Sequence, residues 1–370
     1  MRLRRILLLA VALVVVVAVV SCTGLPGGDG GKTGTSSKDG DAHEYFFCFW
    51  NVENLFDDKD DKRNSIDEQY DNAFADNPKI LKLKLDHLAT AILAMNGGVG
   101  PDIFAGAEVE SIRAAELLKD TLNAKLKEDK KDEKYLYNKV LMVNLDAGRH
   151  IAPCVITRVP VDVRGTKLNK AARLRILETH LLVNGHDLTL MAAHWTSQLK
   201  QRDGSDGDSG REKYAKILFD RFYELAKKDV DVDYMVCGDF NDTPEADSVV
   251  KDLGAIADRT KVKPGNDPKN LPYLLNLMAG KDATKFGTIW YSGKPLIYDQ
   301  ICVSPGMLDK EGWTVDAESV ATVTKDLTRS GGTRREPWRF GDPDRDMKDS
   351  DRGYSDHFPV TVKLKVAAKK

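Results

Sequence analysis

The chain has 370 residues, of which 42% are hydrophobic and 30% are charged. This length is sufficient for one large domain with a buried core, and the charged fraction excludes a protein that crosses a membrane many times. With 55 Lys and Arg against 57 Asp and Glu, the formal net charge is −2, which argues against a protein that holds nucleic acid by overall charge alone.

The N-terminal part differs in composition from the rest of the chain. After "MRLRR", an apolar run from Ile6 to Val20 is shorter than the roughly 20 residues that span a bilayer and is typical of an export signal. The run ends in "VVSC", which resembles the lipobox of bacterial lipoproteins and predicts lipidation of Cys22. We therefore expect a lipoprotein signal peptide over 1–21 and a flexible tether over 22–42. A plain secretory signal and an uncleaved anchor are the alternatives.

From residue 43 onward, strand and helix patterns follow one another. Short apolar runs predict strands, and apolar residues at helical spacing predict helices. In chain order we expect a strand over 45–52, a helix over 78–95, a strand over 102–109, a helix over 113–129, strands over 137–144, 152–161, 174–183 and 188–195, a helix over 211–228, and strands over 233–240, 296–304 and 358–366. Strands with helices interspersed predict a layered α/β domain.

The cysteines other than Cys22 lie in these apolar runs and not in loops. They are Cys48, Cys154, Cys237 and Cys302. Such positions favour buried free thiols over a disulfide framework, although one disulfide is the alternative in an exported protein.

Polar residues are concentrated where the predicted strands end. The first strand ends in "WNVENLFD", with Asn51 and Glu53, and the second ends in "GAEVE", with Glu108. In "VCGDFND", Asp239 and Asn241 occupy alternate positions, so both side chains lie on one side of the strand. Oxygen ligands and amide donors grouped in this way suit a magnesium-type ion and a phosphate.

Two histidines and a buried aspartate add to this set. His194 ends the strand "LMAAHW", and Asp299 lies inside the apolar "LIYDQICVS", where an unpaired carboxylate would be costly. We expect a histidine to be its partner. "GYSDHFPV" places Ser355, Asp356 and His357 side by side, but neighbours on a chain point in different directions and form no catalytic triad by themselves.

In order and in kind, these segments resemble the motifs of a known superfamily. "WNVENLFD", "PDIFAGAEVE", "AHWTSQ", "GDFNDTP", "YDQICVS" and "GYSDHFPV" are similar to the successive motifs of the endonuclease/exonuclease/phosphatase superfamily of metal-dependent phosphoesterases. The resemblance extends from about residue 44 to residue 364. It implies an α/β fold over 43–366, a four-layer sandwich of two mixed β-sheets flanked by helices, with the site at one edge.

The resemblance also implies a role for each residue. The implied catalytic residues are His357, Asp299, His194, Asp239 and Asn241, and the implied ligands of Mg²⁺ or Mn²⁺, with Ca²⁺ as a further candidate, are Glu108, Asn51, Asp356 and Glu53. Glu108 is the principal ligand, Asp299 orients His357, and Asp239 with Asn241 positions the attacking water. Which group is the general base stays open.

The loop before "SDH" is rich in arginine. Basic residues interleaved with an aromatic suit a nucleic-acid backbone, and a solvated loop is the alternative. The expected substrate-binding residues are Arg334, Arg335, Trp338 and Arg339.

Together these patterns predict a divalent-metal-dependent phosphodiesterase, an extracytoplasmic nuclease that cleaves DNA or RNA by metal-assisted in-line attack of water. We expect it to be lipid-anchored to a bacterial membrane or cell surface, and nothing in the sequence indicates an obligate protein partner. The alternatives are a phosphatase or phospholipase C-type phosphoesterase of the same fold, and a non-catalytic surface lipoprotein.

Overall fold

The computed structural model describes residues 43–63, 67–146, 148–168, 174–199, 207–265, 267, 270–329 and 335–369. The predicted signal peptide and tether, with Cys22, lie outside the described residues, as does Arg334. Within the described ranges, no helix has the length and apolar character needed to cross a membrane.

The first sheet is mixed and pairs the two ends of the domain. Its strand order is β14-β15-β1-β2-β4-β3. The strands are β1 (His43–Leu55), β2 (Ile103–Val109), β3 (Lys139–Leu141), β4 (Ala152–Thr157), β14 (Trp313–Thr322) and β15 (Val360–Val366). β1 and β2 are parallel, whereas β1 and β15 are antiparallel. The strand that follows His357 is therefore fixed beside the strand that carries Asn51.

The second sheet is also mixed, with the order β5-β6-β7-β8-β13-β10-β9. Its strands are β5 (Lys167–Leu168), β6 (Ile176–Val183), β7 (His186–His194), β8 (Tyr234–Asp239), β9 (Ala255–Ile256), β10 (Leu274–Asn276) and β13 (Asp299–Val303). β7 and β8 are parallel, and β8 and β13 are antiparallel. A separate hairpin consists of β11 (Ile289–Tyr291) and β12 (Lys294–Leu296).

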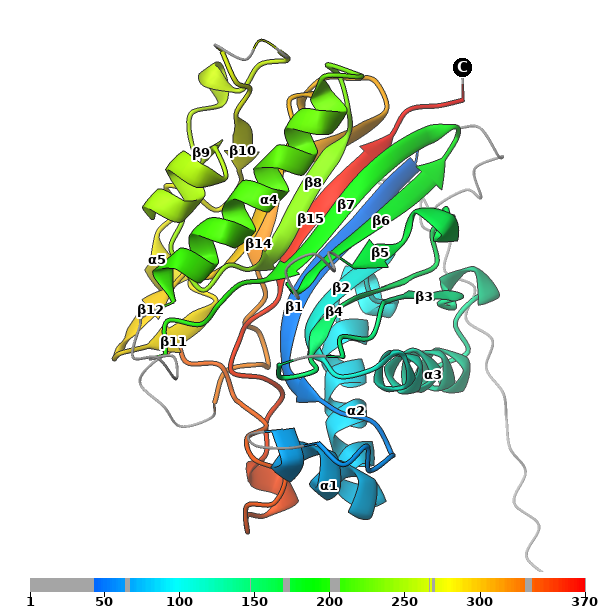
Figure 1. The fold of residues 1–370 in the computed structure, drawn as a ribbon. Coiled ribbons are helices and arrows are strands. Elements are labelled where there is room, and N and C mark those ends of the chain that lie inside the picture. Colours follow the sequence, from blue (N-terminus) through cyan, green and yellow to red (C-terminus); the bar gives the residue numbers. More distant parts are fainter. Residues whose placement is uncertain are drawn as a thin grey trace, which may run out of the picture. The chain divides into compact units, whose positions relative to one another are not determined.

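α2 (Pro78–Leu93) and α3 (Ile112–Glu128) cover the outer face of the first sheet, and α4 (Asp208–Ala226) covers that of the second (Figure 1). The described residues also form α1 (Glu68–Asp76), which packs on α2, and the short α5 (Ala283–Phe286). α2 begins where the Asn77 side chain accepts a hydrogen bond from the Ile80 N–H, and α3 begins at a similar cap made by Ser111. Such caps satisfy main-chain donors that a helix leaves unpaired at its start.

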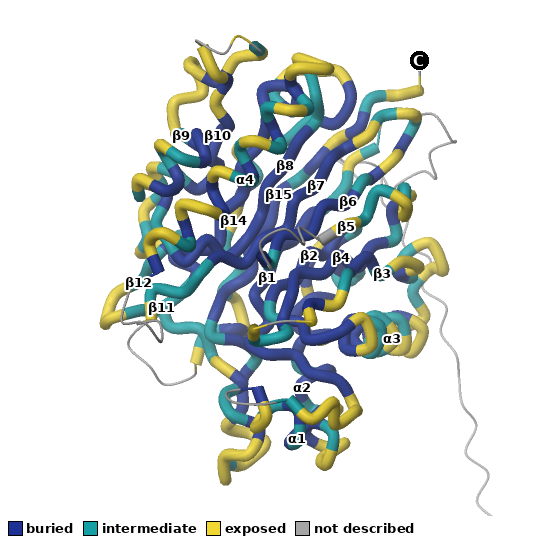
Figure 2. The backbone as a smooth tube through the Cα atoms, viewed as in Figure 1, coloured by how far each residue is buried: buried dark blue, intermediate teal, exposed yellow. Residues whose placement is uncertain are grey.

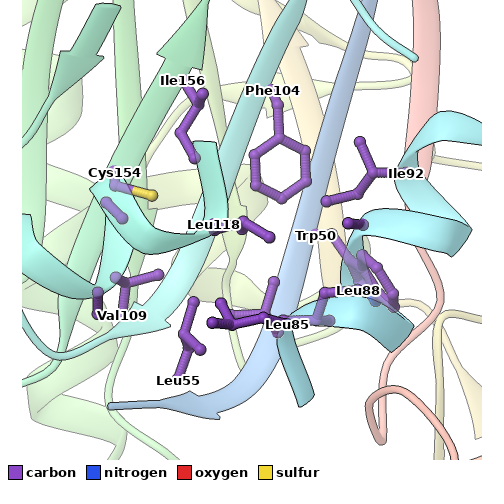
Figure 3. Packing of buried hydrophobic residues seen from close by; sticks show 14 of the residues in the cluster. Trp50, Leu55, Leu85, Leu88, Ile92, Phe104, Val109, Leu118, Cys154 and Ile156 are labelled. Atoms are coloured by element: carbon purple, nitrogen blue, oxygen red, sulfur yellow. The ribbon is translucent and has the colours of Figure 1, made fainter. Parts of the chain in front are cut away.

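Successive side chains of a strand point to opposite faces of its sheet and so pack in different layers. Phe47 and Phe49 of β1 pack between the two sheets, whereas Cys48 and Trp50 pack against the helices of the first sheet. This alternation follows from the two-residue period of a strand, and it leaves the strands buried on both faces (Figure 2). Figure 3 shows the helix side, where Trp50 and Phe104 of the strands meet residues of α2 and α3. A third apolar cluster joins the second sheet to α4.

The predicted fold class is confirmed, since two mixed sheets are flanked by helices. Each predicted strand and helix overlaps an observed one. The sequence patterns missed β14, whose side chains are mostly exposed or half-buried along an edge of the first sheet. The four cysteines of the described part are free and buried, as expected.

Neighbouring leucines in β6 provide a direct test of the inter-sheet core. Leu181 is 0% exposed and Leu182 is 44% exposed. Leu181→Ala should lower the free energy of unfolding by about 2–5 kcal/mol, because it leaves a cavity between the sheets. Leu182→Ala, the matched control, should change it by less than about 0.5 kcal/mol. Urea denaturation measures both, and equal losses would contradict the proposed layering.

Candidate active site

The site lies at one edge of the two packed sheets, where the polar strand ends meet. The register of the second sheet places Asp239 of β8 opposite His194 of β7 and opposite Asp299 of β13. Asn51 reaches the same carboxylate from the first sheet, with its Nδ2 3.1 Å from Oδ2 of Asp239. The structure therefore brings these four sequence-predicted residues into one buried group.

Several residues at this edge have left-handed backbones. The φ angle is 55° at Glu53, 54° at Asn54, 62° at Glu108 and 50° at Asn241. This region is uncommon for residues other than glycine and costs about 1–3 kcal/mol at each position. The register of β1 with β2, and of β2 with β4, shifts close to the first three, and such bulges redirect side chains. Backbone strain is thus concentrated where the polar side chains converge.

Asp299 and His357 form a buried ion pair. Oδ2 of Asp299 lies 2.7 Å from Nδ1 of His357, and the two residues are 58 positions apart. Burial acts to lower the pKa of His357, but the carboxylates of Asp299 and Asp239 outweigh it and raise the pKa well above its ordinary value. The imidazole is therefore charged, with Nδ1 donating to Asp299 and a second proton on Nε2 facing the site.

The turn that carries His357 is held by main-chain contacts on several sides. The Ser355 hydroxyl donates to the Asn51 carbonyl at 2.6 Å and accepts from the His357 N–H at 3.1 Å. Nε1 of Trp50 donates to the His357 carbonyl, and the Phe358 N–H donates to the Thr288 carbonyl. Ser355 is therefore a turn residue whose hydroxyl is already engaged, and its geometry does not suit a nucleophile.

Asp239 is the carboxylate on which the donors of the site converge. Its Oδ1 accepts from the Asn241 N–H at 2.9 Å. Its Oδ2 lies 3.6 Å from Nε2 of His194 and 3.7 Å from Nε2 of His357. Burial raises the pKa of Asp239 to about 7, which is the range in which a carboxylate accepts a proton effectively at neutral pH. Asn241, through its Nδ2, also donates to the Trp195 carbonyl at 3.2 Å.

His194 differs from His357 because its partner is a cation. Nη1 of Arg175 lies 3.2 Å from Nδ1 of His194. A guanidinium only donates hydrogen bonds, so Nδ1 must accept and the ring proton sits on Nε2. Burial, with Arg175, lowers the pKa of His194 well below its ordinary value. His194 is therefore a neutral hydrogen-bond donor directed at Glu108 and Asp239, at 3.7 and 3.6 Å.

Glu108 fits a ligand for a divalent metal. Its carboxylate accepts from Nδ2 of Asn51 at 3.3 Å and from the Asn54 N–H at 3.0 Å, and its side chain is 15% exposed. Within the described part of the chain, it forms no ion pair with Lys or Arg. A hard oxygen ligand that is held in place but has no cation of its own suits Mg²⁺, Mn²⁺ or Ca²⁺.

Two clusters of side chains have donor atoms close enough to one another to bind a metal ion. The donor atoms of Asp239, Asp299 and His357 lie within 4.8 Å of one another, so these residues could also hold a metal ion. An ion bound between Asp299 and His357 would replace their hydrogen bond. The second group, Asp57, Asp61 and Glu110, already contains a cation, because Nη2 of Arg63 pairs with Glu110 at 2.5 Å and with Asp61 at 3.1 Å.

The other predicted ligands, Glu53 and Asp356, both contact Arg339. Nη2 of Arg339 lies 2.7 Å from Oε1 of Glu53 and 3.4 Å from Oδ2 of Asp356. Arg339 was expected to bind substrate, and the structure places it on these two carboxylates. Both carboxylate oxygens of Glu53 have protein donors in this structure, and its role as a metal ligand stays a prediction.

Arg335 and Trp338, the other two described residues that were expected to bind substrate, also contact the protein. Nη1 of Arg335 donates to the Thr284 carbonyl at 3.0 Å, and its guanidinium lies 6.0 Å from the centre of the Phe358 ring. Nε1 of Trp338 donates to the Asp351 carbonyl at 3.1 Å. Trp338 is half-buried in this arrangement. These contacts hold the described part of the loop against the domain, and its role in substrate binding stays a prediction.

Sequence reasoning missed the basic residues that support the site. Arg175 directly precedes β6 and Lys84 lies in α2, and the sequence patterns assigned neither residue to the site. In the structure Arg175 contacts His194, and Lys84 is 0% exposed. The one available signal was the position of Arg175 directly before a strand whose antiparallel partner ends in His194.

Comparison with known proteins gives a consistent result. Residues 46–366 match the sequence model described as "Endonuclease/Exonuclease/phosphatase family". An endonuclease/exonuclease/phosphatase family protein from Bacteroides thetaiotaomicron has a similar structure, with 16% identity and a TM-score of 0.52 over 88% of this chain and 98% of that chain. A mannosyl-6-phosphatase from the same species is similar at 16% identity and a TM-score of 0.51, over 86% and 99% of the two chains. No curated protein sequence matches the chain. At such identities, the structures support the fold alone.

The charge of Asp299 should control the protonation of His357. Asp299→Asn keeps a similar shape but removes the negative charge, so the pKa of His357 should fall by at least about one pH unit. An NMR titration of the histidine ring protons in metal-free protein measures this. His180, whose pKa is raised to about 9 by hydrogen bonds with Asp187 and Glu178, is the internal control and should not move. An unchanged pKa at His357 would contradict the ion pair.

Proposed function

The chain belongs to the endonuclease/exonuclease/phosphatase family, and from this premise we propose that it is a divalent-metal-dependent nuclease that cleaves DNA or RNA outside the cytoplasm. Membership of this family makes the chain a phosphoesterase, an enzyme that hydrolyses phosphate esters. The choice of a nucleic acid as substrate is the proposal.

The observation that carries the hydrolytic mechanism is the placement of three N–H donors around one carboxylate. Nδ2 of Asn51 and Nε2 of His194 and of His357 lie 3.1, 3.6 and 3.7 Å from Oδ2 of Asp239. A scissile phosphate beside Asp239 would therefore meet hydrogen-bond donors that can stabilise the negative charge growing in the transition state. These donors come from both sheets, so little reorganisation is needed when the phosphate binds.

Asp239 and His357 have opposite roles in proton transfer, because one accepts a proton and the other donates one. Asp239, whose pKa burial raises to about 7, accepts a proton from the attacking water, and Asn241 next to it helps to orient that water. His357, held charged by Asp299, donates a hydrogen bond or a proton to a phosphate oxygen. A general base with a pKa near neutrality and a charged hydrogen-bond donor in the same site suit the hydrolysis of a phosphate ester by water.

Glu108, with the Asn51 amide beside it, would hold the divalent ion. When bound there, a Mg²⁺ or Mn²⁺ ion would polarise a non-bridging oxygen and stabilise the leaving oxygen of the phosphodiester. Asn51 contacts both Glu108 and Asp239, and it therefore positions the phosphate next to the Glu108 carboxylate.

The surroundings of His357 support a nucleic-acid strand as substrate. Ile289 of the β11–β12 hairpin pairs with His357 in a β-bridge, so the hairpin lies beside the catalytic turn. A groove of about 270 Å³ next to it is lined by Ile289, Trp290, Pro295 and Arg335, among others. An aromatic ring beside a guanidinium suits the stacking of a base and the binding of its phosphate.

A panel of phosphoesters tests the proposal. The full chain is incubated with plasmid DNA, RNA, sphingomyelin, an inositol polyphosphate and a sugar phosphate, each with Mg²⁺ or Mn²⁺ and each with EDTA. We expect cleavage of DNA or RNA that EDTA abolishes. Hydrolysis of the sugar phosphate, the inositol phosphate or sphingomyelin with intact nucleic acid would favour the phosphatase or phospholipase alternative. No hydrolysis of any substrate would contradict the enzymatic assignment.

His357→Ala tests the mechanism with the same assay. The rate should fall by about 10²–10⁴-fold, because the charged donor to the phosphate is lost. His180→Ala removes a histidine of β6 that pairs with Asp187 at 2.8 Å, away from the site, and should leave the rate unchanged. Full activity in His357→Ala would refute this mechanism.

The location outside the cytoplasm is part of the same proposal and is supported by "VVSC" in the sequence. Mass spectrometry of the mature protein should find Cys22 as a lipid-modified N-terminus. Cys22→Ser is the control and should lack the lipid mass. An uncleaved, unmodified Met1 in the wild-type protein would contradict the anchor.

A further inference from the structure

Glu53 lies at the end of β1, close to the site but saturated with protein donors. Its residue exposure is 5%. Oε1 accepts from Nε of Arg339 at 2.8 Å and lies 2.7 Å from Nη2 of the same guanidinium. Oε2 accepts from the Phe340 N–H at 2.8 Å. Both oxygens therefore have strong donors, and a metal ion could use neither without displacing one of them.

Arg339 joins Glu53 to the catalytic turn. Its Nη2 also lies 3.4 Å from Oδ2 of Asp356, the residue directly before His357. One guanidinium thus bridges two carboxylates that the sequence had suggested as metal ligands. Two like charges that share a pocket require a cation between them, which is the usual role of a metal ion. In this chain a side chain supplies that cation.

A second buried cation lies under the segment that leads into Asp356. Lys84 of α2 is 0% exposed, and its Nζ donates to the Tyr354 carbonyl at 2.8 Å and lies 4.7 Å from the centre of the Phe340 ring. Burial lowers its pKa to about 8, against the opposing effect of Glu53, Asp356 and Glu108. The ammonium therefore keeps its charge at neutral pH.

Glu53 and Asp356 share the Arg339 guanidinium, whereas the contacts of Glu108 are with neutral groups. Its contacts are the amide donors of Asn51 and Asn54 and the neutral His194. In the described part of the molecule, no Lys or Arg forms an ion pair with it. A bound metal ion would therefore stabilise the carboxylate of Glu108 most, and those of Glu53 and Asp356 much less.

We propose that Arg339 takes the place of a second metal ion, so that this enzyme binds one divalent ion, at Glu108, and none at Glu53 and Asp356. This inference rests on the metal dependence in the proposed function and specifies the number and position of the ions. It also makes Arg339 and Lys84 positioning residues, because they fix the segment that leads into His357.

The number of bound Mn²⁺ ions tests the inference without measuring activity. Isothermal titration calorimetry of the full chain with Mn²⁺ should give one ion per chain, and Glu108→Gln should abolish its binding. Two ions in the wild-type protein would overturn the inference while leaving the metal-dependent function intact. One ion that survives Glu108→Gln would also overturn it. No binding at all would overturn the metal dependence, and the inference with it.

Removal of the built-in cation should create a second site. Arg339→Gln removes the guanidinium charge and frees Glu53 and Asp356, so a second, weaker Mn²⁺ ion should bind. Arg335→Gln is the matched control from the same loop, because Arg335 contacts main-chain carbonyls, and it should still bind one ion. Arg339→Met is the second variant if Arg339→Gln does not fold, with the same expected gain. A count of one ion in either folded variant would overturn the inference.

Discussion

The hydrogen bonds of Asn51 are the interaction on which the rest of the site depends. Its Nδ2 contacts Glu108 of the first sheet and Asp239 of the second, at 3.3 and 3.1 Å. Its Oδ1 accepts from the Glu53 N–H, and its carbonyl accepts from the Ser355 hydroxyl. One residue therefore sets the distance between the carboxylate best suited to a metal, the carboxylate best suited to a base, and the turn that carries His357.

Buried carboxylates at one sheet edge are costly, and each is compensated in a different way. Asp299 has the charged His357, Asp239 has the Asn51 amide and a main-chain N–H, and Glu53 has Arg339. Glu108 has neutral donors only. All of these side chains are acidic, so the residue type does not distinguish their roles. The partner of each carboxylate does: it makes one part of an acid–base pair, one part of a structural ion pair and one a metal ligand.

The two histidines illustrate the same point. His357 is charged because carboxylates surround it, and His194 is neutral because Arg175 donates to it. Sequence reasoning placed both in the site, since His194 ends an apolar strand and His357 directly precedes one. It did not find Arg175, because a contact between neighbouring strands depends on register. Lys84 was missed for a related reason: Lys82 and Lys84 look alike in the sequence, yet Lys82 has a 75% exposed side chain and Lys84 is fully buried under Tyr354, which is 270 positions away.

By itself, the sequence determined where the longer central strands and helices α2, α3 and α4 lie, that polar residues end the strands, and that Asp299 needs a partner, because periodicity and the cost of a buried charge act locally. It could not determine how the charges are paired. Arg339 looked like a substrate-binding residue in a basic loop, and only the tertiary structure placed it between Glu53 and Asp356. Which charged side chains pair depends on the side-chain directions that the bulges and left-handed backbones at Glu53 and Glu108 impose. It also depends on loops that bring residues from distant parts of the chain to the site. These are long-range properties, so the fold alone decided which carboxylates are left without a cation.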